Sequence, residues 1–213
     1  SLFAEDLTAR QWLNKMSHAL KESSYQGVLS YRRGDESRSL KIMHGVIDGQ
    51  EYERLIDLEG ARFEIIKHGH DLSCVHVGES KLRLEDSLAS KHLASKPNIK
   101  VDADLESYYQ LKLEKGHRVA DRSARKIIFT PLDQHRYKRI FMLDEKTALL
   151  LQNQILNSKQ GVIEDFKFLD LKFETLPNTE LKFDEHEHQN AHVVNHPVAE
   201  SNPPKSSLAW KAQ

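Results

Sequence analysis

The stretch from Arg118 to Phe173 reads RVADRSARKIIFTPLDQHRYKRIFMLDEKTALLLQNQILNSKQGVIEDFKFLDLKF, and it carries most of the local β signal of the chain. Runs of β-branched, aromatic and aliphatic residues alternate there with clusters of Asp, Asn, Gly and Pro, a pattern typical of antiparallel strands joined by turns. Pro131 ends the first run because proline cannot donate a hydrogen bond to a strand ladder. The pattern predicts a meander of four strands, near residues 118–130, 136–143, 148–156 and 162–173.

The last of these runs changes the face on which its apolar side chains lie. The first three lie at even positions, Val162, Phe166 and Phe168, and the next three at odd positions, Leu169, Leu171 and Phe173. Side chains of a strand alternate with period two, so this switch requires either an inserted residue or burial of both faces. We predict a β-bulge or a strong bend near Phe168 and Leu169.

The chain before this stretch predicts one helix and further strands. Thr8 and Gln11 have the spacing of a capping box, and an apolar stripe follows at helical spacing: Trp12, Leu13, Met16, Ala19 and Leu20. The stripe favours a helix packed on a sheet over one lying on a membrane, because its polar face is not strongly basic. Strands are expected at residues 25–33, 39–46, 51–58, 62–67, 71–77 and 108–113. Asp48-Gly49 predicts a hairpin turn, and Lys115-Gly116-His117 is expected to turn the chain into the opening stretch.

Composition narrows the classes of function. The 213 residues include 31 Lys and Arg against 32 Asp and Glu, so no net field would recruit nucleic acid or an anionic membrane. No apolar run approaches the roughly 20 residues that span a bilayer. The single cysteine, Cys74, lies in a predicted strand and is expected to be a buried free thiol.

The end of the chain has a different character. Residues 183–206 contain three prolines and few large apolar side chains, which predicts a flexible linker. Residues 207–213 regain hydrophobicity around Trp210 and are expected to begin a second, truncated domain. Four histidines lie in this linker: His186, His188, His192 and His196. Their spacing fits no standard zinc motif, so a solvated tail with no dedicated metal site is predicted.

The motifs of the opening stretch carry a family resemblance. In order they are RVA-x-R from Arg118, P-x-D-x-x-RY from Pro131, LDE-x-T-x-LLL from Leu143 and E-x-F-x-F from Glu164. This set resembles the RseB/MucB family of periplasmic sigma-E regulatory proteins. The chain departs from the family pattern at four positions. Asp121, Lys138 and Ala148 stand where glycine is expected, and Leu132 stands where arginine is expected.

The resemblance implies a mainly β (α+β) fold for residues 1–182, an open or half β-barrel of antiparallel strands covered by helices, similar to LolA and LppX. An apolar cleft would then accept acyl chains, and its candidate residues are Tyr25, Leu29, Ile42, Phe129, Phe141, Leu150, Phe166 and Phe168. The candidate binding residues from the family motifs are Arg118, Arg122, Asp133, Arg136, Tyr137 and Asp144. The alternative for the charged residues is that they brace hairpin ends through charge-assisted hydrogen bonds, and for the apolar ones that they pack the core.

The resemblance also implies a function. It predicts a periplasmic protein, secreted with a cleaved signal of which residues 1–4 would be the remnant, that binds the anti-sigma factor RseA and shields it from the protease DegS. Lipopolysaccharide or lipoprotein entering the cleft would be the release signal. The alternative is a lipid or lipoprotein carrier of the LolA type. No stable membrane insertion is expected, and a homo-oligomer is an alternative to a monomer.

Catalysis is not expected. The sequence has no G-x-S-x-G, H-E-x-x-H or C-x-x-C motif and no glycine-rich phosphate loop. His68 and His70 flank Gly69 in a predicted turn, where exposed histidines with no catalytic role are common. We therefore predict a binding protein that requires no cofactor.

Overall fold

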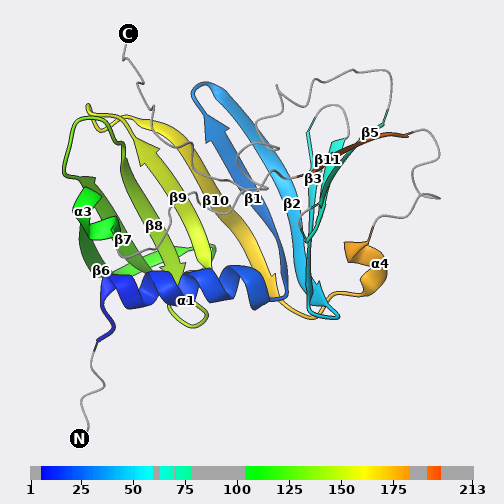
Figure 1. Cartoon of the computed structure of the whole chain (residues 1–213), viewed down its shortest axis with the longest axis horizontal. Helices are drawn as coiled ribbons and strands as arrows, with labels where there is room; N and C mark the ends of the chain where they lie inside the picture. Colours follow the sequence, from blue (N-terminus) through cyan, green and yellow to red (C-terminus); the bar gives the residue numbers. More distant parts are fainter. Residues whose placement is uncertain (1–5, 60–62, 70, 78–103, 183–190, 198–213) are drawn as a thin grey trace, which may run out of the picture.

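The computed structural model describes residues 6–59, 63–69, 71–77, 104–182 and 191–197, and its described strands form one antiparallel sheet (Figure 1). The strand order is β11-β5-β4-β3-β2-β1-β10-β9-β8-β7-β6. The strands are β1 (Tyr25–Arg33), β2 (Glu36–Ile47), β3 (Gln50–Asp57), β4 (Phe63–His68), β5 (Asp71–Val77), β6 (Tyr109–Val119), β7 (Arg122–Pro131), β8 (Lys138–Asp144), β9 (Leu150–Leu156), β10 (Val162–Phe173) and β11 (Ala191–Pro197). The helices are α1 (Ala9–Glu22), α3 (Leu105–Tyr108) and α4 (Asn178–Leu181).

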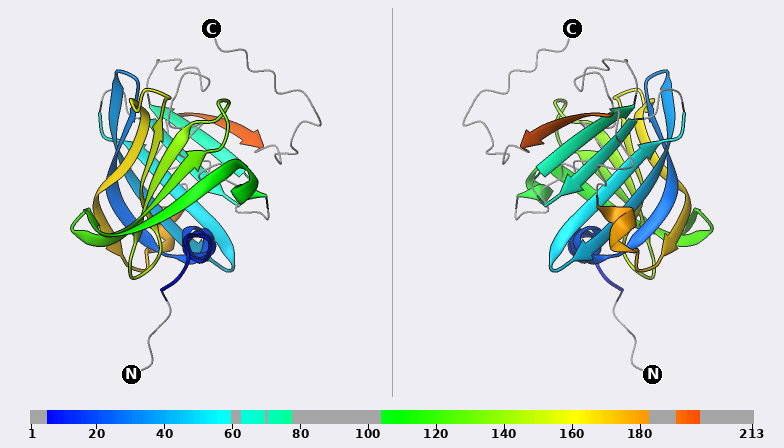
Figure 2. Two further views of the ribbon diagram at one scale, coloured as in Figure 1. Left: turned by 90° about the vertical axis from the view of Figure 1, so that its left-hand side faces the viewer. Right: turned by 90° about the vertical axis from the view of Figure 1, so that its right-hand side faces the viewer.

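Two meanders build the sheet. Strands β1 to β5 pair in sequence order, as do β6 to β10, and the pairing of β1 with β10 joins the two halves. The sheet curves strongly and remains open, with β11 and β6 at its edges, as the two side views show (Figure 2). The predicted mainly β, open antiparallel fold is confirmed.

Helix α1 runs across the strands and covers part of the sheet (Figures 1 and 2). Its predicted capping box is present: the Gln11 N–H donates to Thr8 Oγ1 at 3.2 Å, and the Thr8 N–H donates to Gln11 Oε1 at 2.7 Å. The buried face of the helix, which includes Trp12, Leu13 and Met16, packs against a core formed by β7, β8 and β9. Burial of that apolar face, rather than helix propensity, supplies most of the stability of a short helix.

The predicted bulge in β10 is confirmed. On the neighbouring strand Val28 pairs with Asp170 and Leu29 pairs with Phe168, so Leu169 is the inserted residue. Leu169 is 53% exposed, whereas Phe168 is 1% exposed. Gly27 permits this geometry, because a Cβ atom there would lie 2.3 Å from the Asp170 carbonyl oxygen.

The prediction of a turn at Lys115-Gly116-His117 is wrong. Strand β6 continues through Gly116, which has φ 80° and lies in a bulge between Glu114 and His117. The hairpin turn is formed by Ala120 and Asp121, with φ values of 49° and 61°. Two positive φ values between paired strands are the geometry of a type I′ turn. The RVA-x-R motif therefore spans the β6–β7 hairpin instead of starting a strand.

Two positions where the family pattern has glycine keep the left-handed backbone conformation. Asp121 has φ 61° and Ala148 also has φ 61°. Lys138, the third such position, is the first residue of β8. At Asp121 and Ala148 the chain therefore carries a conformation that glycine adopts at lower energy.

Part of the segment predicted to be a flexible linker is a strand. Residues 191–197 form β11, which pairs antiparallel with β5 along all seven of its residues. The unpaired edge of β5 explains this, because an exposed ladder of N–H and C=O groups favours pairing with any extended segment that can reach it. Cys74 lies in β5, which confirms the strand expected there. Residues 183–190 and 198–213 of the predicted linker and second domain lie outside the described residues.

Candidate functional site

Asp144 and Arg122 form the most buried ion pair among the motif residues. Asp144 ends β8 and its side chain is 2% exposed, while Arg122 begins β7 and donates from Nε to Asp144 Oδ2. The second carboxylate oxygen accepts from the Lys146 and Thr147 N–H groups at 2.8 Å each. Burial raises the pKa of Asp144, but the hydrogen bonds from Arg122, Thr147 and Lys146 together outweigh it, so the pKa lies below its usual value.

This pair braces the β8–β9 loop and connects it to β10. The Ala148 N–H donates to the Asp144 carbonyl at 2.8 Å, which closes the loop as one tight turn. The Arg122 guanidinium also lies 4.8 Å from the centroid of the Phe173 ring, a cation–π contact across the sheet. These contacts fit the bracing role that was the alternative to ligand binding, and a binding role of Arg122 and Asp144 stays a prediction.

The second motif forms an exposed polar and aromatic patch. Asp133 accepts from Arg136 within the β7–β8 loop, and the Arg136 guanidinium lies 4.2 Å from the centroid of the Tyr108 ring. Tyr137, Tyr108 and Leu132 are 54%, 43% and 61% exposed. We call Tyr108, Leu132, Arg136 and Tyr137 the β7–β8 patch. Exposed aromatic and arginine side chains of this kind are enriched where proteins bind other proteins.

The six motif residues lie toward the two ends of β7. Arg118 pairs with Asp121 at the β6–β7 turn, with both side chains mostly exposed, and Arg122, the partner of Asp144, directly follows this turn. Asp133, Arg136 and Tyr137 lie beyond the other end of β7, in the β7–β8 loop. Surface ion pairs of this kind contribute little to stability. The predicted set of binding residues is therefore not one site.

The predicted cleft residues lie in the core. Seven of the eight are buried and Phe166 is half-buried. They divide between two clusters, one containing Tyr25, Leu29, Ile42 and Phe168 and the other containing Phe129, Phe141 and Leu150, with Phe166 packed against both. Tyr31 lies in the first cluster, and its hydroxyl is buried with no hydrogen-bond partner among the described groups. That these residues admit an acyl chain stays a prediction.

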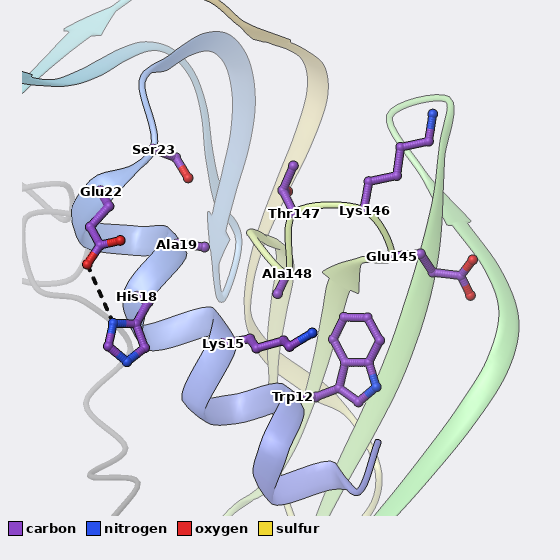
Figure 3. Close-up of a pocket in the computed structure, with 10 residues that line it drawn as sticks. All are labelled: Trp12, Lys15, His18, Ala19, Glu22, Ser23, Glu145, Lys146, Thr147 and Ala148. Carbon is purple, nitrogen blue, oxygen red and sulfur yellow. Dashed lines mark ion pairs between the residues drawn. The ribbon is translucent and has the colours of Figure 1, made fainter. Parts of the chain in front are cut away.

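A groove of about 420 Å³ lies between α1 and the loop that Asp144 braces (Figure 3). One wall is the polar side of α1, with Lys15, His18 and Glu22, and the other is formed by residues 145–148. Figure 3 shows the indole of Trp12 between the two walls and the 3.5 Å ion pair of His18 with Glu22. The groove mixes cationic and anionic side chains with one aromatic ring.

No local sequence pattern indicates this groove. The residues that line it come from two distant parts of the sequence, the predicted helix and the turn that follows Asp144. Of the predicted tail histidines, His192 and His196 lie in β11, where the structure describes the backbone, and His186 and His188 lie outside the described residues. Among the described helices, none has the length and apolar character needed to cross a bilayer.

Comparison with known proteins gives a consistent result. The family model for the MucB/RseB N-terminal domain matches residues 8–192. The sigma factor AlgU regulatory protein MucB of Pseudomonas aeruginosa is 37% identical over 171 residues, which cover 79% of this chain and 52% of that protein. The sigma-E factor regulatory protein RseB of Haemophilus influenzae is 27% identical over 168 residues, covering 79% and 53% of the two chains. The chain thus spans about half the length of these curated relatives.

Solved structures show the same fold. A crystal structure described as MucB in complex with MucA(peri) superposes with a TM-score of 0.70 at 33% identity, covering 88% of this chain and 62% of that one. An uncharacterised conserved protein from Thermus thermophilus shares the fold at 14% identity, with a TM-score of 0.56 and coverage of 85% and 97%.

Proposed function

The chain belongs to the MucB/RseB N-terminal domain family, and on that premise we propose that it regulates a sigma-E-type factor by binding the periplasmic region of the corresponding anti-sigma factor. In this proposal the protein acts in the periplasm, shields the anti-sigma factor from cleavage by DegS and releases it when lipopolysaccharide or lipoprotein binds. It requires no catalytic step.

The relation to MucB carries the proposal. MucB of Pseudomonas aeruginosa is named as a regulator of a sigma factor, and a crystal structure described as MucB in complex with MucA(peri) has the fold described above. The chain spans 62% of that crystallised protein.

The β7–β8 patch supports a role in binding. Its two tyrosines and one leucine are exposed, and Arg136 is held over Tyr108 by its ion pair with Asp133. A preorganised arginine and rigid aromatic rings lose little conformational entropy on binding, which is why such residues dominate interface energetics. We infer that this patch contributes to the surface that meets the anti-sigma factor.

Release by lipid would follow from linkage. A lipid that binds the free form more tightly than the complex lowers the affinity for the anti-sigma factor by the ratio of its two binding constants. Two apolar clusters lie on the curved sheet, and the half-buried Phe166 packs against both, which supports this part of the proposal.

Binding is tested with the full-length protein that contains this chain and the anti-sigma periplasmic region from the same organism. Isothermal titration calorimetry is expected to show a stoichiometric complex, and Tyr137→Ala is expected to weaken it at least tenfold. Leu58→Ala is the matched control, because Leu58 is also exposed, at 51%, but lies after β3 at a distance from the patch in the sheet. Equal affinities of the two variants would remove the patch from the interface.

Protection from DegS and release by lipid are tested by two further assays. DegS cleavage of the anti-sigma factor is expected to slow when the protein is added and to recover when lipopolysaccharide is added. A failure to bind the anti-sigma factor, together with transfer of lipoprotein between membranes, would contradict the proposal and favour a carrier of the LolA type.

A further inference from the structure

Strand β6 forms one edge of the described sheet, next to α3 (Figure 1). It pairs with β7 on one side, and among the described residues no strand pairs with its other side. An edge of this kind presents unpaired N–H and C=O groups to which a further strand can pair. The sheet already accepts such a strand elsewhere, because β11, a segment that follows the two meanders in the chain, pairs with β5.

The pairing with β7 determines which backbone groups of β6 are free. The Leu132 N–H donates to the Tyr108 carbonyl oxygen at 2.9 Å, so this carbonyl points toward the β7 side. Successive residues of an antiparallel strand direct their N–H and C=O groups alternately to the two sides. The register with β7 is regular before the bulge in β6, so the groups that point to the open side of the edge are those of Tyr109, Leu111 and Leu113.

The same three residues carry an apolar row along the edge. Their side chains are half-buried and pack against the core cluster that contains Ile127 and Phe129. Leu111 pairs with Phe129 and Leu113 pairs with Ile127, while the Tyr109 ring meets the Phe129 ring edge-on at 6.0 Å. Strand β7 thus covers one side of the row. An added strand with apolar side chains at alternate positions would cover the other side through cross-strand contacts.

The other face of β6 is positively charged. Glu114 lies between two ammonium groups, 2.8 Å from Lys112 Nζ and 3.3 Å from Lys126 Nζ. Two cations against one carboxylate leave a net charge of +1. The Lys112 side chain is 70% exposed, so an acidic side chain on an added strand can reach it. A second copy of β6 would instead bring the same positive face alongside, which favours a different partner.

The β7–β8 patch continues this edge. Tyr108, which belongs to the patch, directly precedes β6, and its exposed ring lies 4.2 Å from the Arg136 guanidinium. At the other end of β6 the bulge at Gly116 interrupts the ladder, and bulges are a common way to prevent pairing at a sheet edge. The ladder that is free for a further strand is therefore the half of β6 from Tyr109 to Glu114.

We propose that an extended segment of the anti-sigma factor's periplasmic region adds to β6 as a further strand, with its apolar side chains beside Tyr109, Leu111 and Leu113. This inference rests on the proposed function and specifies how the partner binds. Backbone hydrogen bonds to the edge supply affinity, and the apolar row and the positive face select the sequence of the added strand. The same segment then continues onto the β7–β8 patch.

Amide hydrogen exchange, measured by NMR on the full-length protein that contains this chain, tests the pairing residue by residue. The amides of Tyr109, Leu111 and Leu113 are expected to exchange rapidly in the free protein because they point to solvent. In the complex with the anti-sigma periplasmic region they are expected to exchange at least about tenfold more slowly. The amides of Gln110 and Lys112, which point toward β7, are the internal control and are expected to exchange slowly in both states.

A proline variant tests the same hydrogen bonds through affinity. Leu111→Pro removes an outward N–H and places a ring where the added strand would lie, a change that an edge strand tolerates. Leu111→Ala is the matched control, because it loses the same apolar side chain but keeps the N–H. Calorimetry is expected to show binding of the anti-sigma region at least about tenfold weaker for Leu111→Pro than for Leu111→Ala. Circular dichroism checks that both variants fold, and the exchange measurement decides if Leu111→Pro does not.

The outcomes separate strand addition from the proposed function. A complex that forms without slower exchange at the three outward amides, or with equal affinities of the two folded variants, overturns strand addition and leaves the proposed function intact. If no complex forms, the proposed function fails and strand addition fails with it. Exchange at these amides that slows as the concentration of the free protein rises would show that β6 pairs with a second copy, and it would also overturn the proposal.

Discussion

The Arg122–Asp144 pair provides a quantitative test of how the motif residues act. If the pair braces the β8–β9 loop, its two side chains must depend on each other for their contribution to the free energy of unfolding. Replacing Asp144 with Asn keeps an oxygen that accepts from the Lys146 and Thr147 N–H groups but places an amide against the Arg122 guanidinium. Replacing Arg122 with Met keeps the apolar stem and removes the charge.

The magnitude follows from burial. The Asp144 side chain is 2% exposed and that of Arg122 is 25% exposed. Asp144→Asn leaves the guanidinium without its charged partner, and breaking a buried pair costs about 3 kcal/mol. The coupling energy between the two residues is expected to be about 2 kcal/mol, within the range for hydrogen bonds to charged groups. These values are large relative to a total stability of roughly 5–15 kcal/mol.

The assay is a double-mutant cycle measured by urea unfolding, with the fluorescence of Trp12 in the core as the probe. The chain supplies its own control: Arg118 and Asp121 are also an Arg–Asp pair, but their side chains are 67% and 88% exposed. The same cycle there is expected to give a coupling below about 0.5 kcal/mol. Equal coupling in the two pairs would refute the assignment of a bracing role to Arg122 and Asp144.

Three other predictions follow from the structure. Asp121→Gly is expected to raise the free energy of unfolding by about 1 kcal/mol in the same urea assay, because glycine adopts φ 61° without strain; a destabilised variant would contradict this. Phe168→Ala is expected to destabilise by about 3–5 kcal/mol, whereas Leu169→Lys at the exposed bulge should change stability by less than about 0.5 kcal/mol; similar losses for both would place the bulge elsewhere. The lowered pKa of Asp144 means that its stabilising contribution is complete above about pH 4, the unfolded-state value, and is lost as the pH falls through the folded-state value. Acid titration of stability should therefore be shallower in Asp144→Asn, and identical slopes would contradict the cause given for the shift.

The strands and the bulge were predictable because their signals are local. Alternation of apolar residues with period two, and its reversal between Phe168 and Leu169, record directly which side chains face the core. The β6–β7 turn was not predictable in the same way. Gly116 is a typical turn residue but lies in a bulge, whereas the turn is formed by Ala120 and Asp121, of which Ala rarely adopts positive φ. Pairing of the two strands on either side imposes that conformation, and pairing is a long-range property.

Strand β11 was missed for a related reason. Residues 191–197 include histidine, asparagine and proline, and their composition predicts a linker. Their order comes from β5, whose free edge provides hydrogen-bond partners that no local pattern in the linker reveals. Composition predicts the conformation of a segment on its own, whereas an unpaired strand edge can make the same segment a strand in the folded chain.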